Sequence, residues 1–312
     1  MKVLGNPVND AEVLLEASLL RLPQYAPKGL RYAAISGGIT NANYRVVSAS
    51  PEAVLFVKIP GIGTEAFIDR KVANEAAVLA STVALGPRVL HFLSDTGVEV
   101  SEFVEGYRPC NNFDFQTKAV REMAIDCYRK FHAGNLLSQT KTVFDMIDEH
   151  VMQARVLGGI FPEDWEWLHR QYRLARFELE HSGLDITPCF NDPMPGNFML
   201  NAARDRMLLI DYEYASNNDR CYELGIWFGE MFFEEDVERE LIGRYFGEVR
   251  QSIVARCQVY KALADIKWGC WSIVQARQSQ LAFDYSKYGA WKFLRARSVM
   301  HDWRWQSWLR DL

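Results

Sequence analysis

The sequence lacks the features that mark several large classes of protein. It has no run of about 18 uninterrupted apolar residues, so we expect no membrane-spanning segment. Lys and Arg number 35 against 40 Asp and Glu, so the basic excess typical of nucleic-acid and anionic-membrane binders is missing. A composition of 49% hydrophobic and 24% charged residues excludes a disordered or low-complexity chain. We therefore predict a folded protein whose partners include neither nucleic acid nor a membrane.

Cysteines are also few, and their spacing supports neither disulfides nor zinc. The 6 cysteines include no Cys-x-x-Cys pair and have no histidines at zinc-site spacing. Reduced, buried thiols fit this pattern best, which favours a cytoplasmic location. The chain has 312 residues against the roughly 150 of one typical domain, so we expect two lobes.

The spacing of apolar residues changes along the chain. From 30 to 104, short runs rich in β-formers predict strands near 31–36, 43–48, 53–59, 88–93 and 98–104, with one helix at about 65–82. Asn9 or Asp10 can cap an earlier helix. After Gly106 helical spacing prevails, with helices predicted near 120–131, 145–157, 163–181, 220–234, 237–265, 267–283 and 289–310. The pattern predicts a β-rich lobe over 1–104 and a larger helical lobe over 105–312, with a hinge at about 103–109.

A loop between the later helices carries the residues with the clearest chemistry. Asp192 is followed five residues later by Asn197 on a segment stiffened by two prolines, and an apolar strand then ends at Asp211. Carboxylate and carboxamide oxygens are ligands that Mg²⁺ takes together with phosphates. Either half alone fits an ordinary turn. Together they have the layout that a phosphoryl-transfer site needs.

A small-residue turn in the first lobe complements this loop. Gly37 and Gly38 lie between two predicted strands, where glycines let backbone amides approach phosphate oxygens. A plain hairpin has the same sequence signature, so this turn alone does not identify a phosphate site.

A lysine and a glutamate in the first lobe are predicted to pair. Lys58 ends a strand, and in the helix at 65–82 Glu75 stands at helical spacing from Val72 and Leu79, within an apolar stripe. A buried carboxylate needs a cationic partner. We therefore expect Glu75 to pair with Lys58 and to orient it on nucleotide phosphates. The alternative is that Glu75 lies at the edge of the stripe.

Four segments, taken in order, carry a family resemblance. They are 36–46, a nucleotide loop; 190–200, a catalytic loop; 210–214 continuing to Glu230; and the aromatic stretch 268–276 followed by Phe283 and Tyr288. They resemble the choline/ethanolamine kinase branch of the aminoglycoside-phosphotransferase-like, protein-kinase-like superfamily. The resemblance implies an α+β, protein-kinase-like fold with an antiparallel sheet in a nucleotide-binding N-terminal lobe. It also implies a choline kinase-like phosphotransferase that moves a phosphoryl group from ATP to the hydroxyl of choline.

The resemblance also implies a role for each polar residue of the site. Asp192 would accept the proton of the attacking hydroxyl, whereas Asn197 and Asp211 would hold Mg²⁺ on ATP. Lys58, oriented by Glu75, would contact the phosphates. The nucleotide loop would contribute Gly37, Gly38, Thr40 and Asn41.

Aromatic rings are the implied acceptor site. A quaternary ammonium has no N–H group, so ring faces select it through cation–π attraction. Trp268 and Trp271 share a helix face with Gln275, although such spacing without the resemblance would indicate core. Glu230 would be a long-range counter-charge, or would instead pair within its own helix. The implied cage is Tyr214, Trp268, Trp271, Phe283 and Tyr288.

Three departures from the family pattern leave the acceptor open. Phe190 stands where many relatives have a histidine, Met194 where several have a polar residue, and Glu235 where some have another aromatic residue. Ethanolamine, an aminoglycoside or another small amino alcohol are alternatives to choline. A non-catalytic choline or nucleotide sensor is a further alternative, favoured only by Phe190. The sequence also leaves the oligomeric state open.

Overall fold

The computed structural model describes residues 1–312 except 26–28, 36–40, 62, 65–67 and 280. The chain divides into two compact units. Unit 1 comprises Met1–Pro109 and Met199–Tyr214, and unit 2 comprises Cys110–Phe198 and Ala215–Leu312. The predicted boundary lay at residue 104, whereas 105–109 and 199–214 also join unit 1. The reason is local, because β7 (Tyr107–Pro109) pairs with β9 (Phe198–Asn201) in a sheet that also contains β10 (Met207–Leu209).

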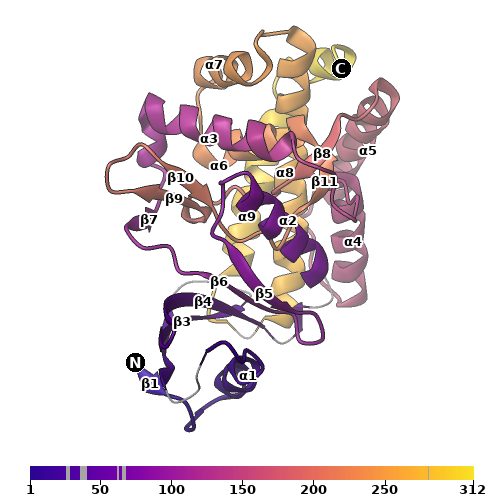
Figure 1. The fold of residues 1–312 in the computed structure, drawn as a ribbon. Helices are drawn as coiled ribbons and strands as arrows, with labels where there is room; N and C mark the ends of the chain where they lie inside the picture. The colour runs from indigo at the N-terminus through magenta and orange to yellow at the C-terminus, as the bar shows by residue number, and fades with distance from the viewer. Residues whose placement is uncertain (26–28, 36–40, 62, 65–67, 280) are drawn as a thin grey trace. The chain divides into compact units, whose positions relative to one another are not determined.

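An antiparallel six-stranded sheet forms the centre of unit 1, in the order β1-β2-β3-β4-β6-β5 (Figure 1). The strands predicted between 31 and 104 are confirmed, with ends shifted by a few residues. Their bounds are β1 Lys2–Val3, β2 Arg31–Ile35, β3 Asn41–Ala49, β4 Glu52–Pro60, β5 Val89–Leu93 and β6 Val98–Glu102.

One face of this sheet is packed and the other carries Lys58. The helix α1 (Asp10–Leu19) begins at the predicted cap, where the Asn9 side chain accepts the Glu12 N–H at 2.9 Å. Leu15 of this helix joins Val57 of β4 in the hydrophobic core of unit 1. Because side chains alternate along a strand, Lys58 lies on the face opposite to Val57 and that core.

The second helix of unit 1 corrects the prediction about Glu75. The helix α2 runs over Arg70–Thr82, and its buried residues are Val72, Ala76, Ala77 and Ala80. Glu75 is exposed, so its placement in the apolar stripe is wrong. The buried stripe consists mainly of alanines, which lets the helix pack closely and turns the glutamate toward solvent.

Unit 2 is mainly helical, as predicted. Its two short strands, β8 and β11, pair antiparallel. The bounds are η3 Asp114–Gln116, α3 Lys118–His132, α4 Val143–Val156, α5 Trp165–Ser182, β8 Ile186–Cys189, η4 Pro195–Asn197, β11 Ser216–Asp219, α6 Arg220–Met231, α7 Glu235–Phe246, α8 Gln251–Gln278, α9 Tyr285–Met300 and α10 Trp305–Arg310.

Three of the predicted helix boundaries in unit 2 are wrong. The helix predicted at 237–265 ends early, because Gly247 follows α7 with φ +82°, a left-handed conformation that glycine adopts without strain. The break predicted at residue 266 is absent, and α8 continues through it. The helix predicted at 289–310 is divided into α9 and α10.

The long helix α8 is the axis of unit 2 and packs against α4, α6 and α9 (Figure 1). Every residue from Ala262 to Gln275 is buried, including charged ones. At Gly269 the α9 helix approaches so closely that a Cβ atom would lie 2.7 Å from Phe293 Cζ. This close approach fixes α8 against α9, the two helices that carry most of the predicted acceptor rings.

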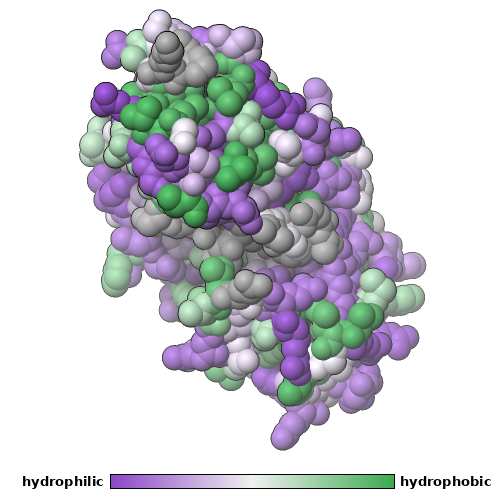
Figure 2. All heavy atoms as spheres, turned by 90° about the horizontal axis from the view of Figure 1, so that it is seen from below, coloured by the Kyte–Doolittle hydropathy of each residue, from purple (hydrophilic) through white to green (hydrophobic). Residues whose placement is uncertain are grey.

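The surface is mixed in character. Figure 2 shows one face on which hydrophobic and hydrophilic residues alternate in patches. Large exposed apolar side chains come from several elements and include Val156, Ile160 and Trp303. Within the described ranges, no helix combines the length and the hydropathy that crossing a bilayer requires.

Candidate active site

In unit 1, a lysine and an aspartate from distant parts of the sequence form an ion pair. Lys58 Nζ on β4 lies 2.6 Å from Asp211 Oδ1, just after β10. Asp211 adopts φ 71°, a left-handed conformation that Asp tolerates better than most residues and that raises local backbone energy. A carboxylate on a strained backbone at the end of a strand is consistent with the metal-binding role that the sequence predicts for Asp211.

A second ion pair stands next in the chain. Arg70 Nη1 on α2 lies 2.5 Å from Glu213 Oε1, and the Asn41 side-chain amide contacts the same oxygen. Asn41, expected in the nucleotide loop, is thus tied to the segment that carries Asp211. The other nucleotide-loop residues predicted, Gly37, Gly38 and Thr40, lie outside the described residues.

The carboxylate nearest to Lys58 within the sheet is Glu99. The β4–β6 register places Lys58 directly opposite Glu99, and Glu99 accepts a hydrogen bond from Asn74 Nδ2 at 2.8 Å. Asn74 lies on α2 beside Glu75. The burial argument for Glu75 as the partner of Lys58 therefore falls, because Asp211 and Glu99 supply the surrounding negative charge. Sequence reasoning missed Glu99, since finding it requires the strand register.

The charges of this cluster have shifted pKa values. Burial alone would lower the pKa of Lys58, but the carboxylates of Asp211, Glu213 and Glu99 outweigh it and hold that pKa above its ordinary value. Burial raises the pKa of Asp211, against the attraction of Lys58. Lys58 is therefore a firmly charged cation, suited to contact phosphate oxygens.

In unit 2, the predicted catalytic loop contains a hydrogen bond between two of its own side chains. It follows β8, and Asn197 Nδ2 donates to both the backbone oxygen and the Oδ2 carboxylate oxygen of Asp192, each at 3.1 Å. Asp192 is buried, with 8% of its surface exposed. The spacing of five residues thus brings the carboxylate and the carboxamide into direct contact.

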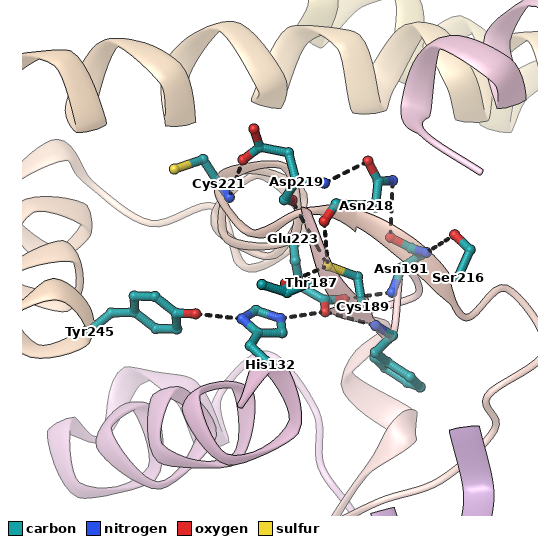
Figure 3. A network of polar contacts seen from close by, with 11 residues as sticks. His132, Thr187, Cys189, Asn191, Ser216, Asn218, Asp219, Cys221, Glu223 and Tyr245 are labelled. Atoms are coloured by element: carbon teal, nitrogen blue, oxygen red, sulfur yellow. Dashed lines mark hydrogen bonds and ion pairs between the residues drawn. The ribbon is translucent and has the colours of Figure 1, made fainter. Parts of the chain in front are cut away.

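A buried glutamate fixes this loop by accepting hydrogen bonds from its backbone (Figure 3). Glu223 of α6 accepts the backbone N–H of Phe190 at 2.7 Å and that of Asn191 at 2.5 Å. Its Oε2 also lies 2.8 Å from His132 Nε2, and His132 Nδ1 lies 2.6 Å from the Tyr245 hydroxyl. His132 is a structural histidine with both ring nitrogens bonded. Glu223 braces the loop through backbone groups, which leaves Phe190 to pack in the core.

The residue before Asp192 is fixed just as firmly. Asn191 has φ 63°, in the left-handed region that Asn tolerates. Its side chain donates to Ser216 Oγ at 2.8 Å and accepts from Asn218 Nδ2 at 3.3 Å, both on β11 (Figure 3). Sequence reasoning placed Asn218 and Glu223 in a family motif but gave neither a role, because both act through contacts that only the fold creates.

The predicted acceptor rings of unit 2 form a contiguous cluster. Ring centroids lie 5.4 Å apart for Trp268–Trp271, 5.9 Å for Trp271–Tyr288 and 6.1 Å for Phe283–Tyr288. These spacings are those of favourable aromatic pairs. Trp268 and Trp271 are almost fully buried, whereas Phe283 is exposed. Tyr214, the fifth predicted ring, belongs to unit 1 and its place in the cage stays a prediction.

The predicted counter-charge Glu230 already has cationic partners. Its Oε1 forms ion pairs with Lys292 and, at 2.9 Å, with Arg295, both on α9. Arg295 Nε also bonds Asp265 Oδ2 at 2.9 Å. Glu230 thus pairs with another helix, not within its own, and these ion pairs lower its pKa although burial opposes them. Its role toward an acceptor stays a prediction.

Lys267 is a residue that sequence reasoning did not single out. It has no exposed surface, and its Nζ lies 3.0 Å from the ring centroid of Trp268. Burial lowers the pKa of Lys267 well below its ordinary value, and the negative charge of Asp192 opposes this shift. An amine therefore lies on one of the predicted cage rings, within electrostatic range of the Asp192 carboxylate.

These features define a class of protein. An antiparallel sheet with a lysine on its third long strand, followed by a helical unit with an Asp-x4-Asn loop, is the organisation of protein-kinase-like phosphotransferases. A family model described as "Choline/ethanolamine kinase" matches residues 32–242, and the chain belongs to that family.

Relatives of both substrate types resemble the chain. A "Probable ethanolamine kinase" of Arabidopsis thaliana is 26% identical over 288 residues, covering 81% of this chain and 75% of the relative. "Probable choline kinase 1" of the same plant is 23% identical, covering 83% and 84%. The crystal structure of a choline/ethanolamine kinase family protein from Mesorhizobium loti matches with a TM-score of 0.77 and 27% identity, covering 90% of this chain and 92% of that one.

The family membership confirms the predicted fold class and the predicted kind of enzyme. The chain is a kinase, a phosphotransferase with an alcohol group as acceptor. The choice between choline and ethanolamine is not decided by relatives, because the names above include both.

Proposed function

We propose that the protein transfers the γ-phosphoryl group of ATP to the hydroxyl of a small amino alcohol, choline or ethanolamine. The hydroxyl oxygen forms a bond to the γ-phosphorus, the bond from that phosphorus to the β,γ-bridging oxygen breaks, and ADP leaves. The hydroxyl proton passes to the carboxylate of Asp192. The products are ADP and the phosphate monoester of the amino alcohol.

The contact between Asp192 and Asn197 is the observation that carries this proposal. A general base must be held still, and Asp192 is fixed by the Asn197 amide and by the Glu223 brace on the preceding backbone. Because the Asn197 Nδ2 donates to Asp192, its Oδ1 is the atom left to face a ligand.

The donor set suits Mg²⁺. The amide oxygen of Asn197 and the carboxylate of Asp211 are hard oxygen ligands of the kind that Mg²⁺ takes beside phosphates. The Asp211 side chain is partly buried but 33% exposed, although Lys58 pairs with it. When bound, Mg²⁺ supplies positive charge that offsets the charge on the transferred phosphoryl group. Lys58 supplies a second, fixed positive charge to phosphate oxygens.

Choline and ethanolamine differ in what an acceptor site must offer. Choline needs ring faces and negative charge, which supports the predicted cage of Tyr214, Trp268, Trp271, Phe283 and Tyr288 with Glu230. Ethanolamine also has three N–H donors that require oxygen acceptors. Both fit a site that holds rings together with carboxylates.

An assay of ADP release with an acceptor panel tests the proposal. Purified protein with ATP and Mg²⁺ should release ADP in response to choline or ethanolamine, and only slowly without acceptor. Omission of Mg²⁺ should abolish the response. Acceptor-dependent release with an aminoglycoside alone would support that alternative, whereas ATP binding without any acceptor response would contradict the proposal and support a sensor.

A further inference from the structure

Lys267 occupies an unusual position for a lysine. It lies in the stretch of α8 that is buried on all sides, and none of its surface is exposed. Its Nζ is 3.0 Å from the Trp268 ring centroid, well inside the distance of about 6 Å at which cation–π attraction operates. One face of Trp268 is therefore taken by an amine of the protein itself.

A lysine also lies near the ring of Tyr288. Lys292 Nζ lies 5.0 Å from the ring centroid of Tyr288 and is ion-paired with Glu230. Two of the rings predicted to form a cage thus interact with lysines of the chain. The carboxylate predicted to attract an acceptor cation also has cationic partners in Lys292 and Arg295.

This arrangement affects the two acceptors unequally. A ring face on which an amine of the protein already lies is less available to a second cation, because the two groups cannot occupy the same position over the ring. A trimethylammonium group depends on ring faces, since it has no N–H group. A primary ammonium can also donate hydrogen bonds to carboxylate and carbonyl oxygens, which Lys267 leaves unaffected.

We infer that Lys267 is a specificity-determining residue, which weakens the ring cluster for quaternary ammonium acceptors and so favours a primary amino alcohol over choline. The inference rests on the proposed function. It depends on the place of the amine over the ring, which burial on α8 fixes, and not on its charge. The substrate class it assigns is a small alcohol with a primary ammonium group.

A methylation series tests the inference on the native enzyme. The acceptors are ethanolamine, its N-methyl and N,N-dimethyl derivatives, and choline, with kcat/KM measured for each. We expect kcat/KM to fall as methyl groups replace N–H groups, with choline about 2- to 30-fold below ethanolamine, the range that one cation–π contact covers. A flat series, or one that rises toward choline, would overturn the inference.

A substitution tests the residue itself. Lys267→Met keeps the length of the side chain and removes the amine. We expect the choline-to-ethanolamine ratio of kcat/KM to rise about 2- to 30-fold. Lys287→Met, which removes an exposed lysine next to Tyr288, should leave the ratio within about 2-fold.

The outcomes separate the two proposals. A folded Lys267→Met protein with an unchanged acceptor ratio contradicts the inference while the proposed function stands. If the variant does not fold, the methylation series on the native enzyme decides. No ADP release with any acceptor of the series overturns the proposed function, and the inference with it.

Discussion

The two units hold their functional carboxylates in different ways. In unit 1, Asp211 and Glu213 contact cations, Lys58 at 2.6 Å and Arg70 at 2.5 Å. In unit 2, the loop that carries Asp192 is held by hydrogen bonds, from the Asn197 amide to Asp192 itself and from backbone N–H groups to Glu223. The difference matches the chemistry expected of each unit.

The ion pair of Lys58 with the partly exposed Asp211 can exchange partners when a highly charged ligand arrives, since each partner retains its charge. Hydrogen bonds between buried groups cannot be replaced so easily, because a buried donor without an acceptor costs about 1–3 kcal/mol. We infer that unit 1 is built to accept phosphates and metal, and that the catalytic loop is built to stay rigid. Four substitutions test this contrast.

The largest expected effect is that of Asp192→Asn. The amide cannot accept the hydroxyl proton, so kcat should fall about 10²- to 10⁴-fold, the range typical of a general base. ATP affinity, measured by calorimetry, should stay within about 3-fold, because the ion pairs of unit 1 are untouched. The control Asp236→Asn changes an exposed carboxylate of unit 2 and should retain activity. Near-native turnover in Asp192→Asn would exclude the assigned base.

The second-largest effect is expected for Glu223, which holds the backbone of the Asp192 loop. Glu223→Gln places an amide where a carboxylate accepts bonds from Phe190, Asn191 and His132, so at least one buried N–H loses its acceptor. We expect a loss of about 2 kcal/mol in the free energy of unfolding, together with a lower kcat and a nearly unchanged ATP affinity. Urea denaturation of this variant beside the exposed Glu234→Gln measures it. Equal stability of the two variants would show that the loop does not depend on the brace.

The stability of unit 2 should also depend on pH through the buried imidazole of His150. Burial lowers the pKa of His150 to about 3, so the folded protein keeps it neutral while the unfolded chain takes up a proton below about pH 6.5. The contribution is complete above pH 6.5 and is lost as pH falls toward 3, with a slope of up to about 1.4 kcal/mol per pH unit.

Denaturation at several pH values, with His150→Gln as the variant, measures this slope. The variant should lose stability less steeply between pH 6.5 and 5 than the native protein does. The exposed His181→Gln is the control. Parallel slopes for native protein and His150→Gln would contradict a buried, neutral His150.

The smallest expected effect is on the KM for ATP, and it distinguishes Glu99 from Glu75. Glu99 lies opposite Lys58 in the sheet, whereas Glu75 is exposed on α2. Glu99→Gln removes a negative charge that acts on Lys58 and should raise the KM for ATP about 3- to 10-fold, with kcat changed less. Glu75→Gln should change KM by less than about 2-fold. The reverse order would restore Glu75 as the partner that the sequence predicted.

Much of this could be predicted from the sequence because it depends on local spacing. The strands of unit 1, the strand position of Lys58 and the Asp192–Asn197 loop follow from alternation, turn residues and motif spacing. Glu75 is misplaced because spacing from Val72 and Leu79 selects one face of the helix, whereas the small alanines Ala76, Ala77 and Ala80 form the buried face together with Val72.

The remaining features depend on contacts between segments distant in sequence. Glu99 is found only from the β4–β6 register, and Glu223 only when α6 lies behind β8. Lys267 stood at a predicted helix break, and its burial follows from the continuity of α8. In each case the surroundings of a charged residue cannot be predicted from the apolar spacing of a single segment.

In the proposed reaction, a carboxylate on a rigid loop directs the phosphoryl group of ATP onto an amino-alcohol oxygen. Phosphorus NMR of a reaction with ATP, Mg²⁺ and ethanolamine follows the transferred group directly. We predict that a phosphate monoester of ethanolamine appears in step with ADP, and that Asp192→Asn forms almost none. Release of ADP with inorganic phosphate and no ester, or ester formation at the native rate by Asp192→Asn, would contradict the account.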